Sequence, residues 1–240
     1  MTCADFANHV VLVTGGTGAL GRAVCLAFAG QGAKVVATYR SSKEFQSLET
    51  AGTGAGVGIE GAQVDVTDDS AVKGLVSRLI QSHGKVDVVV NAVGGYAGGA
   101  KAWEHGADVL DRMLSLNLRS LFAVAGAVIP TMLERKNGAI VNVAAKAGLD
   151  HPAGSAVYAA SKAAALSLAG TLATELKGTG VRVNSVLPNV IDTPANRRDM
   201  GKPDGAPGWV SPEEIARVIL FLSSPEAQSV QGAAIGVYGS

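Results

Sequence analysis

The sequence is poor in the residues that point to disulfide-linked, metal-binding, nucleic-acid-binding or membrane proteins. Its two cysteines, Cys3 and Cys25, lie far apart and belong to no CxxC motif or Cys/His cluster, so neither a disulfide framework nor a metal site is expected. Twenty basic residues balance twenty acidic ones, which leaves no basic field for nucleic acid. We find no signal peptide and no run of ~20 apolar residues, and we expect a soluble cytoplasmic protein without a membrane partner.

What the sequence does contain is an alternation of short β-branched runs and longer helical patterns. Apolar residues make up 48% of the chain and aromatic residues 5%, a composition typical of globular α/β proteins. Strands are predicted at 9–14, 34–39, 59–65, 86–91, 138–143, 181–187 and 233–237. Helices are predicted at 19–30, 42–50, 69–83, 107–135, 156–177 and 212–223. Several of these strands are apolar on both faces, as strands buried between two helical layers are.

This alternation predicts a single α/β domain over residues 1–240. Its core is expected to be a doubly wound, seven-stranded parallel sheet flanked by helices on both faces. The glycine-rich piece at 52–58 is interpreted as a loose loop between a helix and a strand. The segment 194–210 is long, polar and rich in proline and glycine, and loops of this kind often close over a substrate.

The first predicted strand runs into a glycine-rich loop, 14–21, which a helix follows at once. Glycines allow the backbone to approach a pyrophosphate closely, and the helix N-terminus offers free N–H groups to the phosphates. This context indicates a Rossmann-type NAD(P)-binding domain, the alternative being an ordinary tight turn. The predicted contacts in this loop are Gly15, Thr17, Gly18, Ala19, Leu20 and Gly21.

The end of the second strand bears on the choice of cofactor. Residues 39–42 carry no carboxylate that could bind the ribose 2′-hydroxyl of NAD. Arg40 and Ser41 can instead neutralise and hydrogen-bond a 2′-phosphate. NADP(H) is therefore favoured and NAD(H) remains possible. The alternative is that Arg40 is a solvated arginine at a helix start.

The end of the third strand offers a second contact to the same half of the cofactor. Asp65 and the N–H of Val66 are placed where an adenine ring can meet them. Thr67 or Asp68 can equally cap the helix that follows. Both interpretations can hold together, because they use different groups of the same turn.

Tyr158 and Lys162 stand four residues apart, on one face of a predicted helix. A tyrosine normally keeps its proton to pH ~10, and an adjacent ammonium lowers its pKa. Such a pair can donate or accept a proton near neutral pH while a hydride moves. The alternative is a pair on a solvated helix surface, but the phosphate loop upstream argues for catalysis.

Together these motifs resemble the short-chain dehydrogenase/reductase family over essentially the whole chain. The matching residues are Thr14-Gly15 with Gly21, Asp65, Asn91-Ala92-Val93-Gly94, Asn117, Tyr158 to Lys162, and Pro188 followed by Ile191 to Pro194. The resemblance implies an NAD(P)-dependent oxidoreductase acting on a small carbonyl, alcohol or imine-like substrate.

The resemblance also implies a role for individual residues. Tyr158 would be the general acid/base, Lys162 would lower its pKa and hold the nicotinamide ribose, and Asn117 would support a water beside Lys162. The implied cofactor contacts outside the phosphate loop are Asn91, Ala92, Tyr158, Lys162, Pro188, Val190 and Thr193. Relatives often form tetramers, and helices 107–135 and 156–177 carry many small residues, so a homotetramer is expected.

Two positions depart from the family pattern. Ala19 takes the place of the second glycine of the phosphate loop, a small change that we expect cofactor binding to survive. The family's catalytic serine lies thirteen residues before the tyrosine, and that position is Ala145. The missing hydroxyl normally binds the substrate oxygen, and a donor of this kind typically contributes a few kcal/mol. Ser155 or His151 can replace it.

A narrower resemblance, to dihydropteridine reductase, rests on residues 16–21, 94–99, 145–147 and 192–197. That enzyme also lacks the serine, and in a pterin reductase Tyr96 would stack on a flat ring; alternatively, Tyr96 covers the cofactor. The candidate substrate contacts are Tyr96, Ala145, His151, Ser155 and Asn189. A third possibility is a catalytically silent NADP-binding scaffold or sensor, since the serine is absent.

Overall fold

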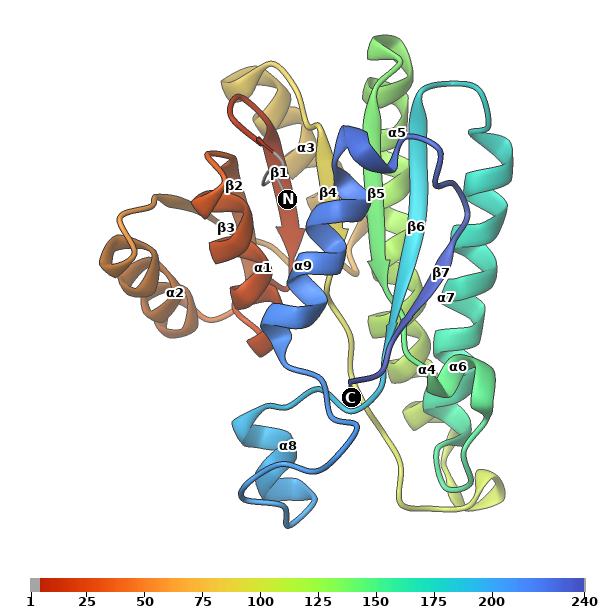
Figure 1. Ribbon diagram of the computed structural model, residues 1–240. Helices are drawn as coiled ribbons and strands as arrows, with labels where there is room; N and C mark the ends of the chain where they lie inside the picture. Colours follow the sequence, from red (N-terminus) through yellow and green to blue (C-terminus); the bar gives the residue numbers. More distant parts are fainter. Residues whose placement is uncertain (1–4, 240) are drawn as a thin grey trace.

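The computed structural model describes residues 5–239 and is built around one parallel sheet (Figure 1). Its strands are β1 (Val10–Thr14), β2 (Lys34–Tyr39), β3 (Ile59–Gln63), β4 (Val88–Asn91), β5 (Gly138–Val143), β6 (Val181–Pro188) and β7 (Ala234–Val237). Within the described residues these seven strands lie in the order β3-β2-β1-β4-β5-β6-β7. Every neighbouring pair is parallel. The predicted α/β class and seven-stranded Rossmann-type sheet are confirmed; Cys3 lies outside the described residues.

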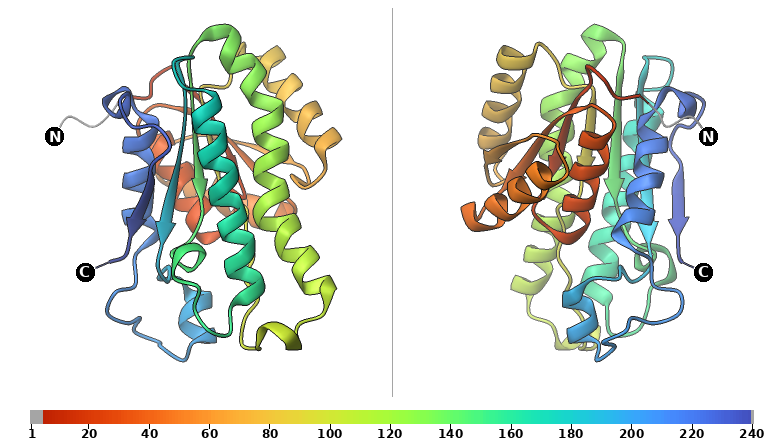
Figure 2. Two further views of the ribbon diagram at one scale, coloured as in Figure 1. Left: turned by 90° about the vertical axis from the view of Figure 1, so that its right-hand side faces the viewer. Right: turned by 60° about the vertical axis from the view of Figure 1, so that its left-hand side comes forward.

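Helices cover both faces of the sheet (Figure 2). They are α1 (Ala19–Gly30), α2 (Ser42–Gly54), α3 (Asp69–His83), α4 (Ala107–Leu114), α5 (Ser120–Arg135), α6 (Ala147–Asp150), α7 (Ala156–Glu175), α8 (Pro194–Asp199) and α9 (Pro212–Ser223). Helices α1 and α9 pack on one face, and α3, α5 and α7 on the other. The shorter α4, α6 and α8 lie around the carboxyl ends of the strands (Figure 1).

The two helical layers enclose two separate apolar cores, because successive side chains of a strand point to opposite faces. In β1, Val11 and Val13 face the layer that contains Phe28 and Ile219. Leu12, between them, faces the layer of α3, α5 and α7. All five side chains are fully buried, and each contributes roughly 1.5–3 kcal/mol through removal of apolar surface from water. The alternation therefore explains why these strands read as continuous apolar runs.

Most predicted elements are observed within one or two residues of their expected bounds, and four regions differ. The helix predicted at 107–135 is interrupted by a π-helix, η2 (Ser115–Arg119). Helix α2 runs on to Gly54, into the piece interpreted as a loose loop, and the short α6 and α8 were not predicted. Cys25 is buried in the α1 layer, as an inert structural thiol should be, and burial raises its pKa to about 12.

Two helical stretches, Ala107–Arg135 and Ala156–Glu175, are long and apolar enough to cross a membrane by length and composition alone. Their most apolar windows have mean hydropathies of 1.5 and 1.2, although neither stretch contains an uninterrupted run of ~20 apolar residues. In the structure both stretches pack against the sheet, and Leu121, Val124 and Ala165 enter the core beneath them. They are therefore core helices of the α/β fold.

Candidate active site

The residues singled out by the sequence gather at the carboxyl edge of the sheet. The strand order reverses between β1 and β4, since β2 and β3 lie on one side of β1 and β4 to β7 on the other. In open α/β sheets such a switch point leaves a crevice outside the strand ends, where ligands bind. The loops after β1, β2, β3 and β4 all open onto it.

The phosphate loop after β1 is held by backbone hydrogen bonds to β2. The N–H of Gly15 donates to Thr38 Oγ1 at 3.0 Å, and the N–H of Gly16 donates to the Thr38 carbonyl at 3.1 Å. Gly15 has a φ of 67°, which favours glycine. Gly21 packs so tightly beneath the loop that an added Cβ would lie 2.1 Å from the Gly15 carbonyl oxygen. Both glycines are therefore required by the backbone itself.

The loop leads into the exposed N-terminus of α1. Gly18 is the N-cap, no described side chain caps the helix, and its first turn contains no acidic residue. Ala19 is exposed at this turn, while Leu20 turns into the core. An uncapped helix N-terminus is a natural site for an anion. The loop and the helix start therefore fit a pyrophosphate.

A cavity of about 240 Å³ extends from this loop along the ends of β2, β3 and β4. Its lining includes the predicted cofactor contacts Gly15, Thr17, Gly18, Arg40, Asp65, Val66 and Ala92. The structure thus brings together the residues predicted to bind the adenosine half of a dinucleotide. Ser41 does not line the cavity; it is the N-cap of α2, where its Oγ accepts from the Glu44 N–H at 3.5 Å.

One carboxylate in this cavity was missed from the sequence. Residues 39–42 hold none, but the first turn of α2 brings Glu44 to the same place. Its Oε2 accepts a hydrogen bond from Thr17 Oγ1 at 3.2 Å, across the phosphate loop. The signal was its position three residues after the N-cap Ser41, where an acidic side chain is favoured. Arg40 and Glu44 therefore present opposite charges to a ribose bound here.

In the turn after β3, different residues serve the two predicted roles, contact with the adenine ring and capping of the next helix. Asp65 accepts hydrogen bonds from the Thr67 N–H and Oγ1 at 2.9 and 2.7 Å, and these bonds hold the pKa of Asp65 below its usual value. Asp68 caps α3 by accepting from the N–H groups of Ser70 and Ala71. Capping thus falls to Asp68, and the turn carrying Asp65 and Val66 lines the cavity.

Asn91 ends β4 as part of a buried polar ladder across three strands. Thr14 Oγ1 donates to Asn91 Oδ1 at 2.8 Å, and Asn91 Nδ2 donates to Asn142 Oδ1 at 3.1 Å. The three residues face one another in register across β1, β4 and β5. The ladder fixes the strand ends on which the crevice is built, because every side chain in it is fully buried.

Asn117 lies in the π-helix η2 and is nearly fully buried. Its Oδ1 accepts from the Gly95 N–H at 3.0 Å, and its Nδ2 donates to the Gly95 carbonyl at 3.1 Å and to Ser161 Oγ at 2.9 Å. The side chain therefore joins the loop after β4 to α7. A π-turn inside an α-helix frequently marks a functional site, and here it carries the predicted relay residue.

Lys162 is buried where β5, α7 and the loop after β4 converge. Its Nζ donates to the carbonyl of Val143, the last residue of β5, at 2.9 Å. A Cβ added to Gly94 would lie 3.1 Å from this Nζ and 2.8 Å from Asn117 Oδ1, so only a glycine leaves room beside both groups. This space, lined by an ammonium and an amide, fits the polar edge of a ribose.

Tyr158 lies one helical turn before Lys162 and is half-buried. Burial raises the pKa of Tyr158 to about 12, with a smaller contribution from Tyr96, and burial lowers the pKa of Lys162 to about 8. The pKa of Tyr158 in the free protein is thus shifted upward by burial, opposite to the lowering by Lys162 that the sequence led us to expect. Tyr158 is held here as a protonated donor.

The remaining substrate candidates lie on two loops near Tyr158. Ala145 follows β5 and is buried, and it presents only a methyl group. Tyr96 packs edge-on against Tyr158 with ring centroids 5.0 Å apart, and its hydroxyl lies 3.3 Å from Ser155 Oγ. His151 is exposed, in a left-handed backbone conformation at the end of α6. Of the two suggested replacements for the serine, Ser155 is the one with a contact to this cluster.

The remaining predicted contacts lie at the end of β6 and in the chain that follows it. Pro188 ends β6, and Asn189 Nδ2 donates to the Gly208 carbonyl at 3.1 Å. Val190 accepts from the Val210 N–H at 3.0 Å, and Thr193 caps α8. The segment 194–210 is thus tied at its return to residues 189 and 190, and it contains a helix where the sequence predicted only a loop.

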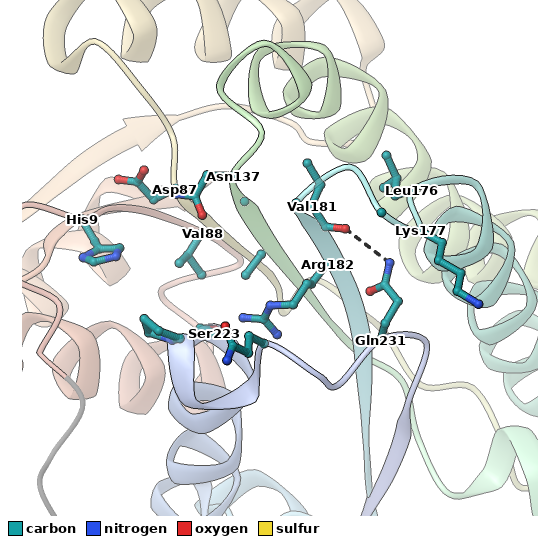
Figure 3. Close-up of a pocket in the computed structure, with 16 residues that line it drawn as sticks. His9, Asp87, Val88, Asn137, Leu176, Lys177, Val181, Arg182, Ser223 and Gln231 are labelled. Carbon is teal, nitrogen blue, oxygen red and sulfur yellow. Dashed lines mark hydrogen bonds between the residues drawn. The ribbon is translucent and has the colours of Figure 1, made fainter.

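A larger cavity, of about 560 Å³, opens at the opposite edge of the sheet (Figure 3). Two of its charged residues, Arg182 and Asp87, already have partners. Arg182 donates to the carbonyls of Leu222 and Ser224 at 2.7 and 3.0 Å, and the buried Asp87 pairs with Arg135 and with Lys85. Because these groups tie strands to helices and face the amino ends of the strands, this cavity is not the candidate active site.

Comparisons with known proteins agree with this geometry. A family model described as short chain dehydrogenase matches residues 9–203. The chain is 36% identical to the 3-oxoacyl-[acyl-carrier-protein] reductase FabG of Thermotoga maritima, covering 97% of each protein. It is 33% identical to (2S)-[(R)-hydroxy(phenyl)methyl]succinyl-CoA dehydrogenase subunit BbsD of Thauera aromatica, covering 97% of this chain and 96% of the relative.

Solved structures of dehydrogenases and reductases superpose on the whole fold. Levodione reductase gives a TM-score of 0.90 at 28% identity, covering 98% of this chain and 97% of that one. NAD+-bound xylitol dehydrogenase gives 0.91 at 26% identity, covering 98% of this chain and 99% of that one.

The packing of Gly21 predicts the effect of one methyl group on nucleotide binding. We expect Gly21→Ala to weaken NADPH binding by about tenfold or more, ~1.4 kcal/mol, because the phosphate loop must move away from its Cβ. Isothermal titration calorimetry with NADPH measures this. Gly30→Ala, in the same helix, is the matched control, since its Cβ would meet nothing within 4 Å. Unchanged affinity in a folded Gly21→Ala variant would contradict the assignment of this loop.

Proposed function

The chain belongs to the short-chain dehydrogenase family of NAD(P)-dependent oxidoreductases, and from this premise we propose that it reduces the carbonyl group of a small substrate with NADPH. In this proposal Tyr158, Lys162 and Asn117 act without the family's serine. Both the cofactor and the substrate occupy the one domain of residues 1–240. The name of the Thermotoga maritima relative, a 3-oxoacyl reductase, supports a carbonyl as the reacting group.

The observation that carries the proposal is the placement of Lys162. A buried ammonium is costly and is rarely retained without a partner. The described contacts of its Nζ comprise one hydrogen bond, to the Val143 carbonyl, and an ammonium has three donors. Gly94 and Asn117 lie beside this nitrogen, and Gly94 also lines the cavity at the strand ends. A ribose hydroxyl placed there would complete the set.

The proton chemistry follows from the residues of this chain. When bound, the reduced nicotinamide would supply the hydride that adds to the carbonyl carbon. Tyr158 donates its phenolic proton to the carbonyl oxygen, so that the alcohol is formed and a phenolate remains. The ammonium of Lys162 stabilises this phenolate, and Asn117, fixed between Gly95 and Ser161, positions the lysine end of the relay from which a proton returns.

The preference for NADPH rests on Arg40. Arg40 lines the adenosine cavity, and its guanidinium suits a 2′-phosphate, whereas the Glu44 carboxylate in the same cavity disfavours that phosphate. An arginine forms bidentate, charge-assisted hydrogen bonds to a phosphate, whereas the Glu44 carboxylate already accepts from Thr17. We therefore propose NADPH as the preferred cofactor, with NADH as the alternative.

Two further expectations from the sequence belong to the same proposal. A homotetramer is supported by small residues exposed along α7, such as Ala160 and Gly170, and by the exposed ring of Phe122 on α5. These helices lie side by side on one face (Figure 2), where close helix packing between copies is possible. The cytoplasmic location stays a prediction.

A second candidate function, a silent NADP-binding scaffold, is favoured by one observation, the methyl group at Ala145. Loss of the serine removes one hydrogen bond to the substrate oxygen. A scaffold would bind NADPH without consuming it in the presence of carbonyl, quinone or pterin substrates. A pterin reductase, suggested by the narrower resemblance, would instead consume it with the pterin alone.

Removing the phenolic hydroxyl tests the proton donor. We expect Tyr158→Phe to lower kcat for NADPH-dependent carbonyl reduction by ~10²–10⁴-fold, the usual contribution of a general acid. Loss of absorbance of NADPH measures the rate, and calorimetry should show that NADPH still binds. Tyr238→Phe removes an exposed hydroxyl elsewhere and should leave kcat unchanged. Full activity of Tyr158→Phe would end the proposed mechanism.

The reduction rate should also depend on pH through Lys162. Reduction needs both Tyr158 and Lys162 protonated; their pKa values lie at about 12 and about 8. The rate should therefore be constant below pH ~8 and fall tenfold per pH unit above it as the ammonium is lost. Single-turnover rates with saturating NADPH and substrate provide the profile. A rate that stays flat to pH 10 would remove Lys162 from the relay.

Exchange of the arginine tests cofactor choice. Arg40→Ala should weaken NADPH binding by about 10–100-fold, the value of a charge-assisted hydrogen bond, and leave NADH binding unchanged. Binding of both cofactors is measured by calorimetry. The control is Lys43→Ala, which removes an exposed cation that does not line the cavity. Equal losses for NADPH and NADH would reject Arg40 as the phosphate ligand.

A further inference from the structure

The site lacks a hydroxyl at position 145 but holds two others close to Tyr158. Tyr96 comes from the loop after β4, and Ser155 from the turn before α7. Their hydroxyl oxygens lie 3.3 Å apart, and the Tyr96 ring packs edge-on against Tyr158 at 5.0 Å between centroids. The two phenols are near enough for Tyr96 to contribute to the raised pKa of Tyr158. A second donor therefore stands beside the proposed proton donor.

Ser155 lacks the hydrogen bond that a purely structural N-cap serine makes. It is the N-cap of α7, a position where a serine hydroxyl usually accepts a hydrogen bond from the first turn of the helix. Its side chain makes no capping bond, although only 7% of the residue is exposed. The hydroxyl is turned toward Tyr96 instead. By contrast, Ser211, the N-cap of α9, accepts from the Glu214 N–H at 3.2 Å in a complete capping box.

The two loops are joined so that this pair keeps its geometry. The N–H of Gly99 donates to the Gly154 carbonyl at 2.8 Å, one residue before Ser155. Tyr96 folds back over its own loop, where a Cβ at Gly98 would lie 2.1 Å from the tyrosine hydroxyl. The glycine thus leaves the room that the phenol occupies. Tyr96 itself is 66% exposed, so a substrate can reach this residue.

We propose that Tyr96, oriented by Ser155, donates the hydrogen bond to the substrate oxygen that the family's serine would donate from position 145. This inference rests on the proposed function. On substrate binding Ser155 donates to the Tyr96 oxygen, and the Tyr96 proton points to the substrate carbonyl. Tyr158 still transfers the proton, so Tyr96 acts as a second catalytic donor and Ser155 as its positioning residue.

The test is a double-mutant cycle between Tyr96 and position 145. We expect Tyr96→Phe to lower kcat by about 10²-fold, the usual effect of removing one such donor, with NADPH affinity unchanged. In the Ala145→Ser background, where the usual hydroxyl is restored, the same change should cost less than about threefold, because one donor then suffices. Ser155→Ala should follow Tyr96→Phe in both backgrounds.

The control separates this role from stability. Ser211→Ala removes a true cap and should lower Tm by about 2–4 °C without changing kcat, while Ser155→Ala should lower kcat with little change in Tm. Equal losses from Tyr96→Phe in both backgrounds, or none in either, would overturn the inference. If instead Tyr158→Phe is fully active, the proposed function itself fails, and the two failures are thus distinguished.

Discussion

A positive charge kept out of water, that of Lys162, is the constraint on which the rest of this site depends. An ammonium of this kind is tolerated only where fixed polar groups replace its hydration. The Val143 carbonyl supplies one partner, and the absence of a side chain at Gly94 leaves space beside the Lys162 nitrogen and Asn117. Because burial pushes the pKa of Lys162 down and that of Tyr158 up, the free protein holds both groups protonated at neutral pH. A bound cofactor and substrate would therefore meet a protonated tyrosine and a protonated lysine, the state that reduction needs.

The fold keeps Lys162 in place by fixing the carboxyl ends of the neighbouring strands. The ladder from Thr14 through Asn91 to Asn142 joins three strands at their carboxyl ends. The π-helix then turns Asn117 inward, where an unbroken α-helix would carry its residues in a different register. Most of the buried polar atoms in these two features are hydrogen-bonded, which limits the cost of burying them, although Asn142 Nδ2 has no partner among the described residues. The hydrogen-bonded strand ends and the π-helix thus fix the positions of the side chains proposed for catalysis.

Periodicity and the glycine loop were enough to predict the sheet, most of its helices and the phosphate loop, because these follow from local pattern and glycine chemistry. Asn91, Ala92 and Asn117 were implied by the resemblance to the family. The narrower resemblance to dihydropteridine reductase stays a prediction. The π-helix, the approach of Glu44 to Thr17 and the pairing of Tyr96 with Ser155 could not be predicted, since each depends on distances between segments far apart in the chain. The tyrosine pKa was expected with the wrong sign for the same reason: a sequence shows which charges are neighbours but not how much water surrounds them.

The amino and carboxyl ends of the strands have different roles in this molecule. Asp87, Arg135 and Arg182 tie strands to helices at the amino edge, whereas the groups proposed for chemistry stand on loops at the carboxyl edge. Replacements in residues 96–101, 150–156 or 194–210 therefore leave those anchors untouched. Substrate specificity can therefore be changed one loop at a time. A library of variants confined to these three segments would sample new specificities on an unchanged sheet.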